Sequence, residues 1–102
     1  MTQWLEHHHD ETITLNRLAH EFNIDKYHMS KVFRQITGFT IMEYLWGCRI
    51  NKAKLHLKMH PDKSIAEISE MVGFTNVSHF SRYFRKSVGM PPLKYRNKHR
   101  GF

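Results

Sequence analysis

Apolar residues recur along this chain at the three- and four-residue spacing that amphipathic helices require. The first clear case follows Thr14, a residue type that caps helix N-termini, and predicts a helix to about Phe22. Its apolar face comprises Leu15, Leu18, Ala19 and Phe22. Asn23 tolerates the left-handed backbone of a tight turn, and Asp25 is a good N-cap for a second helix. The pattern therefore predicts two helices joined by a tight turn.

The same arrangement returns in the second half of the chain. Ser64 and Glu67 have the spacing of a capping box, and Gly73 suits a tight turn. The apolar or small face between them comprises Ile65, Ile68, Ser69 and Val72. Two helices joined through Asn or Gly form either a general helical hairpin or a helix-turn-helix unit. The basic second helix in each pair favours the DNA-binding version.

The second helix of each unit lies in a repeated stretch. Residues 25–44 align with residues 76–95 at a shift of 51 positions. The matched pairs are His28 with His79, Ser30 with Ser81, Phe33 with Phe84, Arg34 with Arg85, Gly38 with Gly89 and Tyr44 with Tyr95. A repeat of this length indicates that one supersecondary unit is built twice.

Each repeated helix is predicted to have an apolar face and a polar face. The apolar faces are Met29, Phe33 and Ile36 in the first copy, and Phe80 and Phe84 in the second. The opposite faces carry hydrogen-bonding and cationic residues without a carboxylate: Tyr27, Ser30, Lys31 and Arg34, then Ser78, Ser81, Arg82 and Arg85. One such face is typical of a solvated helix. Two matching faces favour a polyanion contacted at two places.

A long helix is predicted between the copies, from the capping box of Thr40 and Glu43 to about Met59, before Pro61. Its apolar positions are Leu45, Cys48, Ala53 and Leu57, and we expect Arg49, Lys52, Lys54 and Lys58 to lie in solvent. Eighteen helical residues span about 27 Å, and successive major-groove faces of B-DNA lie about 34 Å apart. We therefore expect an all-α fold with about seven helices: helix-turn-helix subdomains at 1–39 and 61–102, joined by a linker helix at 40–60.

The two ends are predicted to add short helices. The first should close near Asp10–Glu11, bury Trp4 and Leu5, and leave His7–His9 in solvent; these histidines are otherwise an expression remnant or a weak metal-binding tract. The last should begin at the prolines after Met90. Leu93 and Tyr95 are expected to pack inward, and Lys94, Arg96, Lys98 and Arg100 to form a basic tail.

Charge narrows the class of partner. The 102 residues carry a net charge of +7 with a sequence pI near 9.8, which favours an anionic partner. From residue 71 onward there are seven Lys or Arg and no Asp or Glu, a segregation that a nucleic-acid-binding face requires. The single Cys48 excludes an intrachain disulfide and is typical of a reducing compartment.

Segments of this pattern resemble one protein family. Residues 65–96, IAEISEMVGFTNVSHFSRYFRKSVGMPPLKYR, are very similar to the signature of AraC/XylS-type bacterial transcription regulators. Residues 15–45 resemble that family's first unit, and residues 49–57 its linker helix. The resemblance implies two recognition helices that enter major-groove segments about one turn apart on one face of promoter DNA. It also implies transcription activation through RNA polymerase, in the bacterial cytoplasm at the nucleoid.

The resemblance also assigns roles by position. The implied base contacts are Tyr27, Ser30, Lys31, Val77, Ser78, Ser81 and Arg82. The implied phosphate contacts are Lys26, Arg34, His79 and Arg85, together with the N-termini of the reading helices. Arg82 has better geometry than Lys31 for guanine O6 and N7. Tyr27 is alternatively a core residue at the helix start.

The chain departs from the family pattern in two respects. Met90, followed by two prolines, stands where the family usually caps its last helix with serine or a similar residue. Many members carry a separate effector-binding domain, and none is expected in this chain, which is either a minimal regulator or the reading domain of a longer one.

Other functions find less support. His20-Glu21 begins a zinc-protease motif, but position 24 is Ile24 where the second histidine is required, so we expect no catalysis. His56 and His60 are four residues apart without an evident third ligand, so we expect neither a metal nor a cofactor. The main alternative is a sequence-neutral architectural nucleic-acid binder. RNA is disfavoured because Phe33, Phe74 and Phe84 are expected to face inward.

Overall fold

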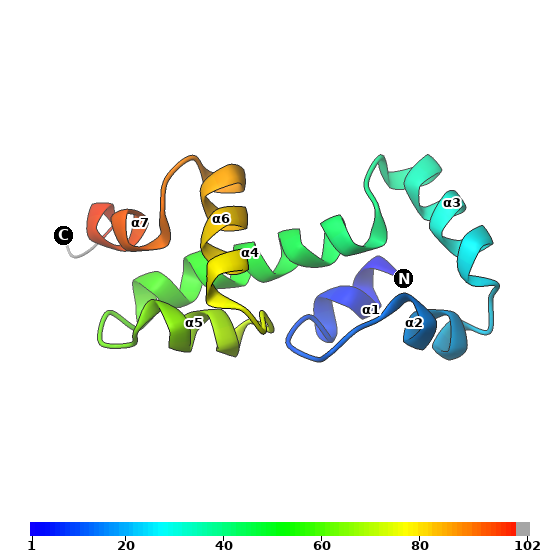
Figure 1. Cartoon of the computed structure of the whole chain (residues 1–102), viewed down its shortest axis with the longest axis horizontal. Coiled ribbons are helices and arrows are strands. Elements are labelled where there is room, and N and C mark those ends of the chain that lie inside the picture. The colour runs from blue at the N-terminus through cyan, green and yellow to red at the C-terminus, as the bar shows by residue number, and fades with distance from the viewer. Residues whose placement is uncertain (100–102) are drawn as a thin grey trace.

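The computed structural model describes residues 1–99, which form an elongated all-α molecule of 47 × 22 × 22 Å (Figure 1). Its described helices are α1 (Thr2–His7), α2 (Leu15–Phe22), α3 (Lys26–Thr37), α4 (Ile41–Met59), α5 (Ile65–Met71), α6 (Val77–Val88) and α7 (Pro92–Lys98). The predicted fold, two helix-turn-helix units on a long central helix, is confirmed. In the described part of the chain, no helix has the length and apolar character needed to cross a membrane.

Side-chain caps fix where the helices begin. Thr14 accepts a hydrogen bond from the Arg17 N–H, and Asp25 accepts one from the His28 N–H at 3.0 Å. Both predicted capping boxes form, at the start of α4 and of α5. Each cap satisfies N–H groups that have no partner within their helix, and substituting one by alanine typically costs about 1 kcal/mol.

Left-handed residues make the tight turns. Asn23, the one described non-glycine residue with positive φ, has a φ of 52° between α2 and α3. Gly73, with a φ of 99°, occupies the equivalent turn between α5 and α6. Both turn predictions are confirmed.

The central helix α4 contributes to two hydrophobic cores. Ile41 and Leu45 join the first core, which contains Leu5, Ile13, Leu18, Met29 and Phe33. Ile50, Ala53 and Leu57 join the second core, which contains Ile68, Val72, Phe74, Phe80, Phe84 and Tyr95. Since α4 belongs to both cores, the subdomain boundaries at 39/40 and 60/61 stay a prediction.

Several positions differ from the amphipathic pattern. Ile36 is 79% exposed although the pattern placed it inside, because α3 turns its last apolar residue past the edge of the first core. Leu93 is likewise exposed, at 54%, whereas Tyr95 is buried as predicted. Arg49 and Arg96, expected in solvent, are both buried. Their guanidinium groups donate to backbone carbonyls, although the buried Nε of Arg96 has no hydrogen-bond partner.

Both chain ends form the expected helices, with some differences. α1 ends at His7, earlier than predicted, and buries Leu5 completely but Trp4 only partly. The ring of His8 stacks on Trp4 at 4.1 Å, so this histidine is not simply solvated. α7 begins at Pro92 despite Met90, since proline suits the first turn of a helix. Arg100 of the predicted basic tail lies outside the described residues.

Candidate nucleic-acid interface

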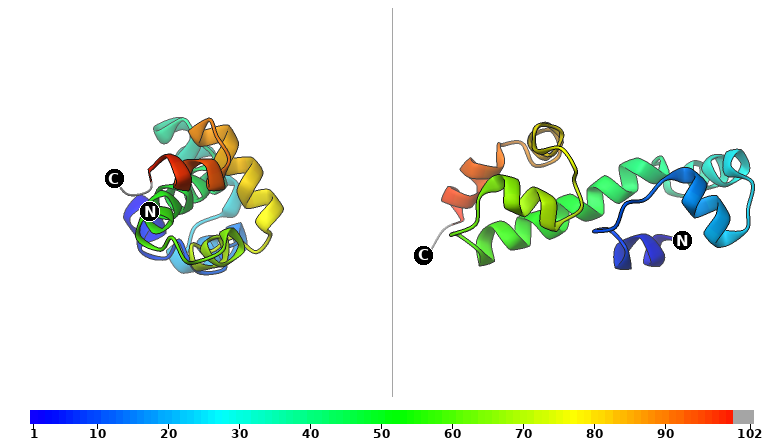
Figure 2. Two further views of the ribbon diagram at one scale, coloured as in Figure 1. Left: turned by 90° about the vertical axis from the view of Figure 1, so that its left-hand side faces the viewer. Right: turned by 60° about the horizontal axis from the view of Figure 1, so that its bottom comes forward.

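α3 and α6 lie on the same long side of α4, opposite α1, α2 and α5. Figure 1 shows this side at the top, and the end-on view in Figure 2 agrees. Each is a twelve-residue helix without an Asp or Glu between its caps. The structure therefore brings the two repeated basic helices together on one side of the molecule.

In the first unit, the residues predicted to contact bases lie at or near the surface. Tyr27 is 76% exposed, so it is not the core residue that the sequence left open. Lys26 Nζ lies 5.3 Å from the centroid of the Tyr27 ring. Ser30 is half-buried and its Oγ donates to the Lys26 carbonyl at 3.0 Å, whereas Lys31 is exposed.

In the second unit, Val77, Ser78 and Arg82 are exposed and Ser81 is half-buried. Arg82 Nε lies 3.4 Å from the Ser78 carbonyl oxygen, a weak contact that leaves the guanidinium fork available. Both units therefore present one flexible cation beside serine hydroxyls. That arrangement can donate hydrogen bonds to base edges.

The four predicted phosphate contacts are placed differently. Arg34 and Arg85 are exposed, and Lys26 is half-buried. The ring of His79 is also half-buried and lies edge-on to Trp46 at 5.0 Å and to Phe74 at 5.5 Å. This packing gives the His79 ring a structural role in holding α6 on α4. Its contact with phosphate stays a prediction.

Cations from both reading helices act on one carboxylate. Hydrogen bonds from Thr40 are the main cause that lowers the pKa of Glu43, and the charges of Arg34 and Lys86 lower it further. Arg34 belongs to α3 and Lys86 to α6. Cations of both reading helices therefore contribute to the electrostatic environment of Glu43.

Lys86 was missed by the sequence reasoning. It is exposed on α6, four residues after Arg82, so the two cations share a helix face. The spacing could have revealed it. The repeat concealed it, because the matching position in the first copy is the uncharged Gln35.

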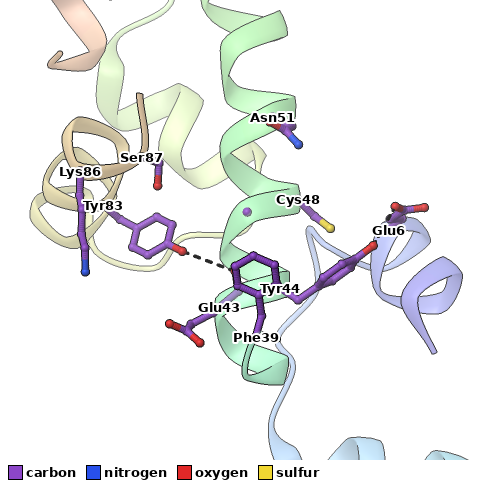
Figure 3. Close-up of a pocket in the computed structure, with 10 residues that line it drawn as sticks. Glu6, Phe39, Glu43, Tyr44, Cys48, Asn51, Tyr83, Lys86 and Ser87 are labelled. Carbon is purple, nitrogen blue, oxygen red and sulfur yellow. Dashed lines mark hydrogen bonds between the residues drawn. The ribbon is translucent and has the colours of Figure 1, made fainter. Parts of the chain in front are cut away.

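A cleft of about 410 Å³ opens over α4 between α6 and α1 (Figure 3). It is lined by Glu6, Phe39, Glu43, Tyr44, Gly47, Cys48, Asn51, Tyr83, Lys86 and Ser87. Across it, Tyr44 Oη donates to Glu6 at 3.2 Å, and Tyr83 Oη lies 3.5 Å from the Glu43 carbonyl oxygen. Burial raises the pKa of the Cys48 thiol, which makes it a poor nucleophile.

No cluster of three or more potential metal ligands occurs among residues 1–99. The three consecutive histidines serve the end of α1 instead. Nδ1 of His7 lies 2.7 Å from the Gln3 carbonyl oxygen, and Nδ1 of His8 lies 2.8 Å from that of Trp4. The Trp4 carbonyl also accepts a hydrogen bond from the His8 N–H at 3.0 Å, so these rings pack against the last turn of α1.

Comparison with known proteins identifies relatives over most of the chain. Residues 18–98 match the model of a helix-turn-helix domain. The chain is 32% identical to the bifunctional transcriptional activator/DNA repair enzyme AdaA of Bacillus subtilis, over 94% of this chain and 45% of that protein. It is 31% identical to the transcriptional activator RhaS of Escherichia coli, over 97% of this chain and 35% of that protein. The chain thus spans less than half the length of these relatives.

Solved structures share the fold. The C-terminal domain of AraT, a response regulator from Geobacillus stearothermophilus, superposes with a TM-score of 0.91 at 27% identity, over 99% of this chain and 84% of that one. The DNA-binding domain of AdpA, solved with a target DNA, gives 0.88 at 25% identity, over 95% and 86%. A probable AraC family regulator from Rhodopseudomonas palustris gives 0.88 at 22% identity, over 98% and 94%, which concerns the fold alone.

The sequence resemblance, the family model and the doubled helix-turn-helix fold agree. This chain belongs to the AraC/XylS-type helix-turn-helix family.

Proposed function

We propose that this chain binds double-stranded DNA in a sequence-specific manner and regulates transcription, as an activator. α3 and α6 enter two successive major-groove segments on one face of the duplex. Lys31 and Arg82, with the neighbouring serines, Tyr27 and Val77, contact base edges. Lys26, Arg34, His79 and Arg85 contact phosphates.

One observation carries this proposal: two cationic helices without carboxylates lie on the same side of a single long helix. A net charge of +7 is enough for non-specific binding to polyanions. The placement of both helices on one side is not needed for that and favours specific binding to one duplex. The 19 residues of α4 span roughly 28 Å, comparable to the roughly 34 Å between major-groove faces one turn apart. This similarity in length supports the proposal that both helices contact one duplex.

The functions stated in the names of the relatives support the proposal. RhaS and AdaA are both described as transcriptional activators, and the AdpA domain was solved with its target DNA. By this analogy the chain acts in the bacterial cytoplasm, at the nucleoid, and contacts RNA polymerase at a promoter. The repair activity in the name of AdaA is not proposed here, because this chain matches only 45% of that protein.

An effector-binding domain, if the protein has one, lies outside these residues. We propose neither a cofactor nor catalysis for the chain itself.

Selection from random double-stranded oligonucleotides with the purified protein tests the proposal. We expect a bipartite, non-palindromic site whose two conserved segments have centres about 10 base pairs apart. Enrichment without any shared sequence would instead support a sequence-neutral architectural protein.

A further inference from the structure

The two helix-turn-helix units are connected twice, and α4 is only one of the connections. The other is the segment between α1 and α2, residues 8–14. In Figure 1 and in the right-hand view of Figure 2, this segment extends from the first unit to the turn between α5 and α6. Contacts at both of its ends hold it there.

On the α4 side, Arg49 holds the segment. This arginine is 6% exposed. Its Nε donates to the His9 carbonyl oxygen at 2.6 Å, and its Nη2 donates to the Glu11 carbonyl oxygen at 3.0 Å. The guanidinium carbon lies 5.7 Å from the centroid of the Phe74 ring. Burying a cation is costly unless its donors are satisfied, so this geometry needs both carbonyls in place.

On the second-unit side, the segment touches the turn at Gly73. A Cβ atom added there would lie 2.5 Å from the His9 carbonyl oxygen, 2.9 Å from Arg49 Nε and 3.0 Å from the Asp10 Cα. No side chain fits in that space. The absence of one lets the segment lie directly against the turn that precedes α6.

On the first-unit side, Arg17 of α2 holds the same segment. Its Nη2 pairs with Glu11 Oε1 at 2.7 Å, and its Nη1 donates to the Thr12 carbonyl oxygen at 2.7 Å. A continuous path of polar contacts therefore runs from α2 through the segment to Arg49 and the turn before α6.

α4 alone is a weaker connection than its length suggests. Gly47 lies between Leu45, in the first core, and Ile50, in the second. Glycine disfavours helix by about 1 kcal/mol relative to alanine. A Cβ at Gly47 would have no neighbour within 4 Å, so no close contact requires a glycine there. Arg49, two residues further along α4, joins the helix to the segment and so braces it.

We propose that Arg49 is a positioning residue: through residues 9–12, it fixes the direction of α6 relative to α3. As far as DNA is concerned, this inference rests on the proposed function. Arg49 would then determine which spacing between the two half-sites the protein accepts, without touching DNA itself. Fixed geometry matters because simultaneous engagement of two linked sites depends on their match in distance and direction.

A distance measurement without DNA tests the inference directly. Spin labels are placed on Gln35→Cys and Ser87→Cys, both exposed positions, in a Cys48→Ser background. We expect one narrow distance distribution in this parent and a clearly broader one after Arg49→Lys, which keeps the charge and loses the two-donor fork. Lys52→Arg, on the exposed face of α4, is the matched control and should leave the distribution narrow. An equally narrow distribution in folded Arg49→Lys would overturn the inference.

The second measurement uses DNA. The preferred bipartite site is compared with sites whose spacer is two base pairs longer or shorter. We expect Arg49→Lys to reduce the ratio of these affinities by about tenfold, while binding to an isolated half-site changes less than about twofold. An unchanged ratio would overturn the inference. Absence of any spacing preference in the wild type would contradict the proposed function instead, and the label distances would still decide the role of Arg49.

If Arg49→Lys fails to fold, Arg17→Gln cuts the same path at a more exposed point. It should also broaden the distance distribution, to a smaller degree. A folded Arg17→Gln protein with the parent's narrow distribution would then overturn the inference.

Discussion

Arg82 is the side chain that we expect to contribute most to the recognition of the DNA sequence. Its guanidinium is exposed on α6 and weakly held by the Ser78 carbonyl. Replacing it by alanine should weaken binding to the selected site by about 1–3 kcal/mol and relax preference at one position of the second half-site. Titration against a set of single-base variants measures both effects. Lys52→Ala, exposed on α4, is the control, and an equal loss on every sequence would reassign Arg82 to phosphate.

Arg34 should behave differently, because it is proposed to contact phosphate. Replacing it by alanine should lower affinity for specific and unrelated DNA alike. The slope of log affinity against log salt concentration should also become shallower, by about one released counterion. Binding isotherms at several salt concentrations give this slope. An unchanged slope would remove Arg34 from the phosphate contacts.

His56 makes stability depend on pH. Burial lowers its pKa below the ordinary 6.5, and the neighbouring His60, His9 and Lys52 lower it further. The unfolded chain therefore binds this proton more readily than the folded one, so stability is lost as the pH falls below about 6.5. Thermal unfolding from pH 7.5 to 5 should show a smaller loss in His56→Gln than in the wild type. Identical pH profiles would contradict this.

At the scale of single residues, the sequence predicted the burial of apolar side chains better than the burial of charged ones. Periodicity correctly placed Met29, Phe33 and Phe84 inside. It failed for Arg49 and Arg96, because a buried arginine is stabilised by backbone carbonyls from distant segments. Those carbonyls carry no signature in the sequence.

Among the elements, α4 gives the clearest prediction. Gly47 is helical, and a Cβ there would meet nothing, so Gly47→Ala should raise the free energy of unfolding by about 0.5–1 kcal/mol. Urea denaturation measures the change. Gly38→Ala is the contrasting control. It has open space too, but its φ of +82° strains alanine, so it should destabilise the protein. A destabilised Gly47→Ala would show that a contact requires the glycine.

Helix boundaries were largely predictable because their signals are local. Thr14, Asp25, Thr40 and Ser64 all cap the helices expected of them, through hydrogen bonds within three residues. The end of α1 was less predictable. Its histidines bond to their own helix's carbonyls, so it closes at His7 without a residue type that reliably marks a stop.

At the scale of the whole molecule, the repeat predicted two equivalent units, and the capping box and apolar positions of residues 40–59 predicted the helix that joins them. The second connection, from Arg17 through residues 9–12 to Gly73, was not predicted. It is formed by residues 9–12, Arg49 and Gly73, which are far apart in the sequence and come into contact only in the folded chain. The candidate reading faces were visible in sequence because they lie on helices with a regular period.

The proposed function requires both reading helices to contact one face of one duplex. Hydroxyl-radical footprinting of the full chain on its selected site tests this most directly. We expect two protected segments whose centres lie about 10 base pairs apart, both on the same face of the DNA, with the opposite face open to cleavage. A single protected segment, or two segments on opposite faces, would contradict it.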